Sequence, residues 1–336
     1  MRAFSYDRPD SVDAALRGVA GQPGTTTEAA VKFVAGGTNL LDLMKADVMR
    51  PERLVDISRL GLDRIEDIDG GGLRLGALAR NADTAYDARV QARYPMLSKA
   101  ILAGASAQLR NMATNGGNLL QRTRCYYFYD TGTPCNKREP GTGCGALTGV
   151  NRIHAILGAS DHCIAVHPSD MCVALAALDA VVRVSGPKGE RTIPFADFHR
   201  LPGDTPHIDS SLAADELITA IDLPAQGFAR HSTYLKVRDR ASYAFALVSV
   251  AAALDLDGQT VRSARLALGG VAHKPWRDPA AEAELAGKPA SLESFREAAR
   301  VLLRDAKGQS HNSFKIALAE RAIVRALAEA AGVEHS

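Results

Sequence analysis

The sequence has no cysteine over most of its length. Its five cysteines all lie between residues 125 and 172, and the remainder of the 336-residue chain has none. Cysteines scattered through a hydrophobic core would not gather in this way, so the segment that holds them is chemically special. Disulfides are not expected there, because the chain is expected to fold in a reducing cytoplasm.

Excess charge and long apolar runs are also missing. With 40 basic and 38 acidic residues the formal net charge is +2, which argues against nucleic acid or an anionic membrane as the main partner. The most apolar stretch, residues 244–256, is shorter than the roughly 20 residues that a membrane span needs, so no membrane insertion is expected. Hydrophobic residues make up 46% and charged residues 23%, which is typical of a globular protein with two or three domains at this length.

Several common signatures are absent. The start, MRAFSYDRPDSVDAAL, has no apolar run behind a basic segment, so we expect no signal peptide and synthesis in the cytoplasm. Neither GxGxxG nor a Walker loop occurs, which argues against the usual NAD and ATP sites. Without GxSxG or HExxH, a hydrolase elbow and a zinc-protease helix are also excluded.

The apolar pattern predicts an α+β protein. Helices are expected at residues 11–20, 39–48, 81–91 and 96–107, again from about 168, and from 280 onward. Strands are expected at 32–35, 54–57 and 73–78, then as a hairpin at 181–194, and finally as four strands in succession between 216 and 268. Residues 119–165 interrupt this rhythm as a loop-rich insertion, and a domain boundary is expected near residues 224–230.

Two glycine loops carry the first chemical signal. The first is a strand, a double glycine and a helix start; the second repeats a hydroxyl, two glycines and a side-chain amide, as Thr114, Asn115, Gly116, Gly117 and Asn118. Glycine lets the backbone approach a ligand closely, and a helix start favours phosphate. Each loop alone could be an ordinary turn, but two in one domain could hold both ends of a pyrophosphate.

The two motifs AGGTNL and RNMATNGGNL together resemble the FAD-binding subunits of the xanthine dehydrogenase and carbon monoxide dehydrogenase family. The resemblance extends over nearly the whole chain and includes ARLALGGVAHKPWR, which is similar to the signature of that family's C-terminal domain. It implies that both loops bind the FAD phosphates. The first loop then contributes Phe33, Val34, Ala35, Gly36, Gly37, Thr38, Asn39 and Leu40.

Three further residues match the family pattern in order. Asp170 resembles the family's FAD-contacting aspartate, Ile218 its aliphatic flavin contact, and Lys236 a lysine near the flavin ring. The ordinary alternatives are a helix cap for Asp170, a core position for Ile218 and a solvated side chain for Lys236. Their mutual spacing favours the cofactor roles.

The insertion departs from most of the family. Four of its cysteines have the spacing C-x9-C-x8-C-x18-C, which suits zinc or a [4Fe–4S] cluster and by itself leaves the metal open. The segment is similar to the insertion of the periplasmic aldehyde oxidoreductases, which implies a [4Fe–4S] cluster on Cys125, Cys135, Cys144 and Cys163. Cys172 lies on the apolar face of a helix and is interpreted as a small buried hydrophobe.

Cationic and aromatic side chains surround these cysteines. Arg122, Arg124, Lys137 and Arg138 are interpreted as solvated, or as compensating the charge of a thiolate-bound cluster. The aromatic run at residues 126–129 would either pack or shield the cluster from solvent. The histidines of the segment are interpreted as hydrogen-bonding residues, because four cysteines already complete a ligand set.

The resemblance implies a two-subdomain FAD-binding fold of the vanillyl-alcohol-oxidase and CO-dehydrogenase-flavoprotein type over residues 1–225. The insertion lies at 119–165, and a smaller α+β domain follows at 226–336. The implied function is electron transfer in a molybdenum-dependent aldehyde oxidoreductase, which converts aldehyde and water to a carboxylic acid. No catalytic residue is expected on this chain.

The implied partners are a large molybdenum-cofactor subunit and a small [2Fe–2S] subunit, in a heterotrimer or its dimer, and an external electron acceptor. The complex would be cytoplasmic, or periplasmic by export with a signal-bearing partner. Two alternatives remain open: a subunit of a 4-hydroxybenzoyl-CoA-reductase-like or xanthine-dehydrogenase-like enzyme, and a zinc-stapled scaffold without a redox role.

Overall fold

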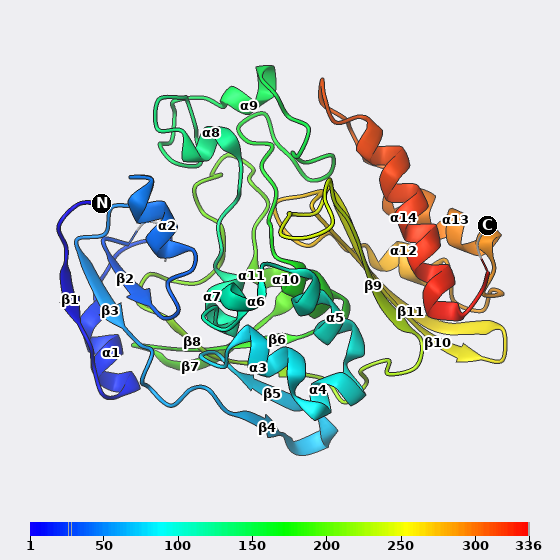
Figure 1. The fold of residues 1–336 in the computed structure, drawn as a ribbon, viewed down its shortest axis with the longest axis horizontal. Coiled ribbons are helices and arrows are strands. Elements are labelled where there is room, and N and C mark those ends of the chain that lie inside the picture. Colours follow the sequence, from blue (N-terminus) through cyan, green and yellow to red (C-terminus); the bar gives the residue numbers. More distant parts are fainter. Residues whose placement is uncertain (26, 28, 335–336) are drawn as a thin grey trace.

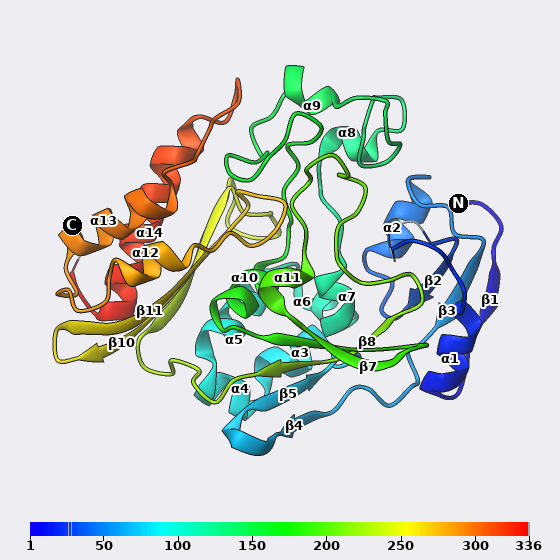
Figure 2. The same ribbon diagram turned by 180° about the vertical axis from the view of Figure 1, so that it is seen from behind.

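The computed structural model describes residues 1–25, 27 and 29–334. Figures 1 and 2 show three bodies side by side: a small N-terminal subdomain in blue, a central subdomain around a five-stranded sheet, and a C-terminal domain in yellow to red. The loop-rich insertion lies above the centre in both views. This arrangement confirms the predicted α+β class, with two subdomains followed by a smaller C-terminal domain.

The N-terminal subdomain is a parallel three-stranded sheet with two helices. The strand order is β1–β3–β2, from β1 (Ser5–Asp7), β3 (Arg53–Asp56) and β2 (Val31–Val34). Helix α1 (Val12–Val19) begins after Ser11, whose Oγ accepts a hydrogen bond from the amide of Ala14 at 3.3 Å. Helix α2 (Leu40–Lys45) follows β2 directly, so the first glycine loop lies at the carboxyl end of a strand.

The central sheet is antiparallel throughout, although its strands come from distant parts of the chain. Its order is β4 (Ile65–Asp67), β5 (Leu73–Gly76), β8 (Leu217–Leu223), β6 (Val181–Gly186) and β7 (Gly189–Pro194). A 3₁₀ turn, Asp69–Gly71, joins the first two strands. Because β8 pairs between β5 and β6, the segment after the insertion completes the same sheet that the segment before it begins.

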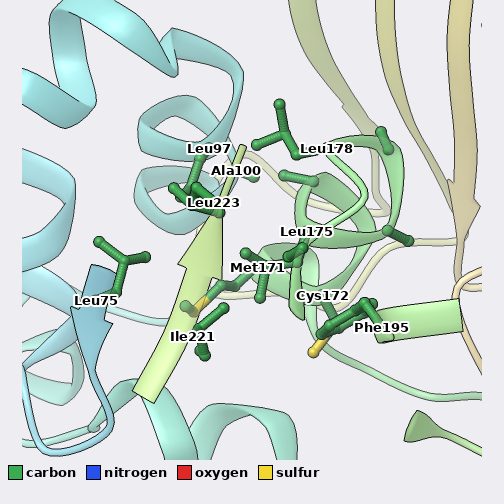
Figure 3. Close-up of a cluster of buried hydrophobic side chains, with 14 of the residues drawn as sticks. Leu75, Leu97, Ala100, Met171, Cys172, Leu175, Leu178, Phe195, Ile221 and Leu223 are labelled. Atoms are coloured by element: carbon green, nitrogen blue, oxygen red, sulfur yellow. The ribbon is translucent and has the colours of Figure 1, made fainter. Parts of the chain in front are cut away.

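Helices α5 (Pro95–Ala103) and α10 (Asp170–Ala177) pack with this sheet. Figure 3 shows Met171 and Leu175 of α10 facing Ile221 of β8, and each of these side chains is at most 1% exposed. Burying a side chain of this size stabilises the fold by roughly 1.5–3 kcal/mol. The core therefore fixes α10 against β8.

One predicted helix is divided in two. The pattern over residues 81–91 predicts a single helix, but the structure has α3 (Asn81–Tyr86) and α4 (Ala88–Arg93). Asp87 between them is extended, with φ −59° and ψ 127°, and its carboxylate accepts the amide of Arg89 at 2.8 Å. A short acidic side chain can cap a new helix in this way, and apolar spacing does not reveal it.

The insertion contains little regular structure. Its only described helices are α8 (Tyr126–Tyr129) and α9 (Gly145–Thr148), each about one turn long. Three other short helices lie elsewhere in the chain: α6 (Ala107–Arg110), α7 (Asn115–Leu119) and α11 (Phe195–Phe198).

The C-terminal domain is an antiparallel sheet covered by helices. Its strand order is β11 (Thr260–Gly269), β10 (Val248–Asp257) and β9 (Ser232–Val237), and its helices are α12 (Pro279–Ala283), α13 (Leu292–Leu302) and α14 (Phe314–Ala331). Helix α14 contacts β10. Helices α5 and α10 of the central subdomain also contact β10. The first seven residues of β10 are accordingly buried without alternation. Among the described residues, no helix has the length and apolarity that crossing a bilayer requires.

Candidate cofactor site

The first glycine loop lines a cleft of about 1190 Å³. The wall includes β2, the loop after it, the start of α7 and β8. All eight residues predicted from the first motif line this cleft: Phe33, Val34, Ala35, Gly36, Gly37, Thr38, Asn39 and Leu40. Ile218 of β8 lines it as well and is 4% exposed.

The two glycine loops are in direct backbone contact. A Cβ atom added to Gly36 would lie 1.8 Å from the carbonyl oxygen of Met112, which is too close for any side chain. Gly37 has φ +72°, a conformation that side chains rarely adopt. Glycine at position 36 therefore lets the two loops meet, and glycine at position 37 allows the turn that precedes α2.

The second motif begins a helix instead of forming a free loop. Thr114 caps α7, and its Oγ1 accepts the amide of Gly117 at 3.3 Å. Thr114, Gly116 and Gly117 line the first cleft. Asn115 is fully buried and donates to Gly76 O at 3.2 Å, so its side chain secures the loop to the sheet.

Asn118 likewise makes contacts within the protein. Its Nδ2 donates to Asn81 Oδ1 at 2.7 Å, and its Oδ1 accepts the hydroxyl of Ser169 at 2.5 Å. Of the five residues predicted from this motif, three line the cleft. The side chains of the two asparagines hold the motif in place. Sequence reasoning could not separate these roles, because both depend on elements more than 30 residues away.

The cleft wall contains unsatisfied polar atoms, which suit a polar ligand. Buried polar groups in folded proteins are almost always hydrogen-bonded. Yet within the described part of the chain, four side-chain atoms from the lining residues are buried and have no partner: Asn39 Nδ2, His167 Nε2, His199 Nδ1 and Ser210 Oγ. A polar ligand such as a dinucleotide phosphate or ribose would satisfy them. Sequence reasoning missed His167, His199 and Ser210 as cleft residues, and no motif marks them.

A second cleft of about 1040 Å³ adjoins the first, and His167 lines both. It lies between the insertion, the start of α10 and the C-terminal domain. Asp170 lines it and forms an ion pair with Lys236 of β9, with 2.7 Å between Oδ2 and Nζ. The hydroxyl of Tyr234 donates to the other oxygen of Asp170 at 2.6 Å.

The structure thus brings Asp170 and Lys236, two of the predicted cofactor residues, into direct contact. Both side chains are less than 10% exposed, so the alternative of a solvated Lys236 is wrong. The positive charge of Lys236 is compensated by the Asp170 carboxylate. Burial, together with this carboxylate, raises the pKa of Tyr234 well above its usual value, so its hydroxyl remains a donor.

The four insertion cysteines share one small core. Cys125, Cys135 and Cys163 are buried, Cys144 is partly buried, and Phe128 packs among them without exposure to solvent. Cys135 and Cys144 are paired across a short antiparallel bridge, and the thiols of Cys144 and Cys163 are in contact. All five cysteines of the chain are free thiols.

Burial raises the pKa of the Cys125 thiol to about 11. A bare thiolate is therefore disfavoured at this position, whereas coordination to a metal would remove the proton. Four converging thiols without disulfides fit a metal or iron–sulfur ligand set. The aromatic run packs into this core through Tyr127, Phe128 and Tyr129, while Tyr126 is 57% exposed.

Two cations predicted to be solvated, or to compensate a cluster, are buried. Arg122 and Lys137 are 9% and 3% exposed, and both form ion pairs with Asp209; the Arg122 Nε to Oδ2 distance is 2.7 Å. Although burial opposes it, the charges of these two cations hold the pKa of Asp209 below its usual range. The solvated interpretation is therefore wrong for Arg122 and Lys137. Asp209 lies 72 residues after Lys137 in the chain, and no sequence motif marks it.

His167 and His199 also approach Cys172 of α10. Among the described residues, these three form the one group of potential metal ligands whose atoms all lie within 4.8 Å of one another. Cys172 is fully buried in the central core, as predicted from its helical position. Both histidines have pKa values lowered by burial, to about 4 for His199, so their rings are neutral.

The fold and the two adjoining clefts are typical of a class of proteins that bind a dinucleotide cofactor without a Rossmann fold. Residues 2–226 match the model of the FAD binding domain in molybdopterin dehydrogenase, and residues 233–330 match the CO dehydrogenase flavoprotein C-terminal domain. The chain therefore belongs to the FAD-binding medium subunits of the molybdenum hydroxylase family, and the predicted family is confirmed.

Individual relatives support the same family assignment. The chain is 53% identical to the aldehyde oxidoreductase FAD-binding subunit PaoB of Escherichia coli, over 98% of this chain and 99% of that one. It is 29% identical to the glyceraldehyde dehydrogenase medium chain of Sulfolobus acidocaldarius, over 85% and 82%. Carbon monoxide dehydrogenase from Hydrogenophaga pseudoflava has the same fold, with a TM-score of 0.75 and 27% identity over 98% of this chain and 97% of that one.

Proposed function

We propose that this chain is the FAD- and [4Fe–4S]-carrying electron-transfer subunit of a molybdenum-dependent aldehyde oxidoreductase. It would receive electrons from a molybdenum subunit and a [2Fe–2S] subunit and deliver them to an external acceptor. The observation that carries the proposal is the position of Cys125. This first cysteine of the insertion lines the same cleft as Asp170, so the thiol core and the proposed flavin site share a wall.

The residues of the two clefts would hold FAD in two parts. Gly36, Gly37, Thr114 and Gly117 would bind the phosphates in the first cleft, where unsatisfied side chains supply further hydrogen bonds. Asp170 would contact FAD from the second cleft, with Lys236 behind it, and Ile218 would contact FAD from the first cleft. When bound, FAD connects one-electron carriers with an acceptor of one or two electrons.

The insertion thiols are not gathered as a preformed tetrahedral zinc site. The four sulfurs of a tetrahedral zinc site lie only about 3.8 Å apart when each Zn–S bond is about 2.3 Å. No three of the insertion thiols belong to a ligand group within 4.8 Å, in the part of the chain that the structure describes. A [4Fe–4S] cluster would supply a one-electron carrier beside the proposed flavin site, and this position favours the cluster over zinc.

Elemental analysis of the purified complex tests the proposal. We expect FAD, about four irons and four acid-labile sulfides per copy of this chain, and bleaching of both chromophores by an aldehyde under anaerobic conditions. Stoichiometric zinc without sulfide would favour the scaffold alternative. Reduction by a purine but not by aldehydes, or reoxidation of the reduced protein by a 4-hydroxybenzoyl-CoA thioester, would contradict the proposed substrate class.

A further inference from the structure

His154 lies between the thiol core and the second cleft. Its Nε2 is 3.1 Å from the Sγ of Cys125, and the residue is only 1% exposed. It lines the second cleft together with Cys125 and Asp170. Its imidazole is therefore in contact with a proposed cluster ligand on the side where that ligand adjoins the proposed flavin site.

The backbone of His154 is fixed by a distant part of the chain. Its carbonyl oxygen accepts hydrogen bonds from Asn312 Nδ2 at 3.1 Å and from Lys315 Nζ at 2.8 Å. Its amide donates to Asn151 O at 3.0 Å. Lys315 belongs to α14, is fully buried and also donates to Gly270 O. These contacts involve only main-chain atoms of His154, so its imidazole can be replaced without removing them.

A sulfur that is bound to iron carries no proton and can only accept a hydrogen bond. In the loaded protein the 3.1 Å contact therefore places the proton on Nε2 of His154, which donates to Cys125. Hydrogen bonds to cluster sulfurs are one of the factors that set the reduction potential. They stabilise the more negative, reduced state of the cluster and so raise its potential.

We propose that His154 is a positioning and tuning residue, whose Nε2–H bond to the Cys125 sulfur raises the reduction potential of the cluster. The inference rests on the proposed function, because it requires a cluster on Cys125. It assigns a role to a histidine of the insertion, which acts on the one proposed cluster ligand that lines the second cleft.

Two substitutions in the holoprotein separate tuning from folding. His154→Leu fills a similar volume without a donor, whereas His154→Gln keeps an N–H near the sulfur. We expect both variants to retain full iron and FAD. In a potentiometric titration followed by electron paramagnetic resonance, the cluster potential should fall in His154→Leu and stay close to wild type in His154→Gln. The flavin potential should be unchanged in both.

His162→Leu provides the matched control. It lies in the same insertion, but its side chain is 51% exposed and it pairs with Asp204 instead of a thiol. A cluster potential that moves as far in His162→Leu as in His154→Leu would overturn the specific role of His154. So would full iron with an unmoved potential in His154→Leu, or iron loss in that variant alone. Wild-type protein without iron would overturn the proposed cluster as well, and iron analysis identifies that case first.

Discussion

The two cofactor regions of this protein are built in different ways. The first cleft is formed by loops at the ends of regular elements, β2, α2 and α7, whose positions the surrounding sheets determine. The thiol core is formed by the insertion, which has only two one-turn helices and a small apolar cluster. The first region is shaped by regular elements of the fold, whereas the second is built from irregular loops around a small apolar cluster.

This difference has an energetic meaning. Ordering one residue costs roughly 1–2 kcal/mol of backbone entropy, and the insertion has little apolar surface with which to offset that cost. Bonds between metal and thiolate exist only in the folded state and can supply the missing stabilisation. Removal of each cofactor should therefore have unequal consequences in the two regions.

The largest expected effect follows loss of a cluster ligand. Replacing Cys125, Cys135, Cys144 or Cys163 by Ser should remove about four irons per chain and leave the insertion sensitive to protease. Because the insertion walls the second cleft, FAD should be depleted too. Iron, flavin and limited proteolysis measured on each variant provide the test. A variant that keeps its iron would show that its cysteine is not a ligand.

Loss of a glycine in the first cleft should remove only the flavin. In Gly37→Val and Gly117→Val the new side chain meets Leu41 or Thr114 at less than 3.0 Å, where the backbone would have to approach phosphate. We expect FAD-depleted protein that retains its iron. Gly61→Val is the matched control, because Gly61 also has a positive φ but a Cβ there meets nothing within 4 Å. Full FAD in both cleft variants would contradict the phosphate-loop assignment.

A smaller effect is expected when Asp209 is replaced. This residue lines the first cleft and forms ion pairs with two cations of the insertion. Asp209→Asn leaves Arg122 and Lys137 buried without a countercharge, which typically costs about 3–5 kcal/mol for a buried ion pair. Denaturant unfolding should show this loss, with partial release of both cofactors. Asp204→Asn is the control, since its side chain is 96% exposed and its removal should be neutral. Equal stability of the two variants would mean that the buried pairs contribute nothing.

Sequence reasoning located the local parts of this architecture and missed the distant ones. The helix after Ser11, the hairpin at 181–194 and the first glycine loop depend on neighbours in the chain, and the structure has them close to where the pattern predicts. Asp209, His199 and Ser210 reach the site only through the tertiary fold. Chain-local patterns carry no information on such contacts, so Arg122 and Lys137 could not be assigned a partner.

A still smaller effect is expected for Lys236→Ala, which should change the reduction potential of the flavin and leave FAD bound. Lys236→Ala would leave the buried Asp170 carboxylate uncompensated at the second cleft. An unpaired negative charge there disfavours reduction of a nearby flavin, so its potential should fall. Spectroelectrochemistry of the purified variant measures the shift, and adding Asp170→Asn to it should reverse the change. An unchanged potential would place this ion pair away from the flavin ring.

The smallest effect is expected for Cys172, the one cysteine outside the insertion core. It lies fully buried in the central core, and burial raises the pKa of its thiol to about 12, so it is a neutral hydrophobe. Cys172→Ser should keep all iron and all FAD. Its cost should be about 1–3 kcal/mol in unfolding experiments, from burying a hydroxyl.

Because two histidines adjoin Cys172, the Cys172→Ser variant also tests for a metal site at these three residues. His167, Cys172 and His199 have ligand atoms within 4.8 Å of one another and could in principle hold a metal. If they did, Cys172→Ser and Cys172→Ala would both lose metal while the four insertion variants kept it. The comparison of the two regions predicts the opposite. The thiol core needs its ligand for order, whereas Cys172 lies on a helix that β8 and α5 already hold in place. Metal analysis of the five single serine variants distinguishes the two sites.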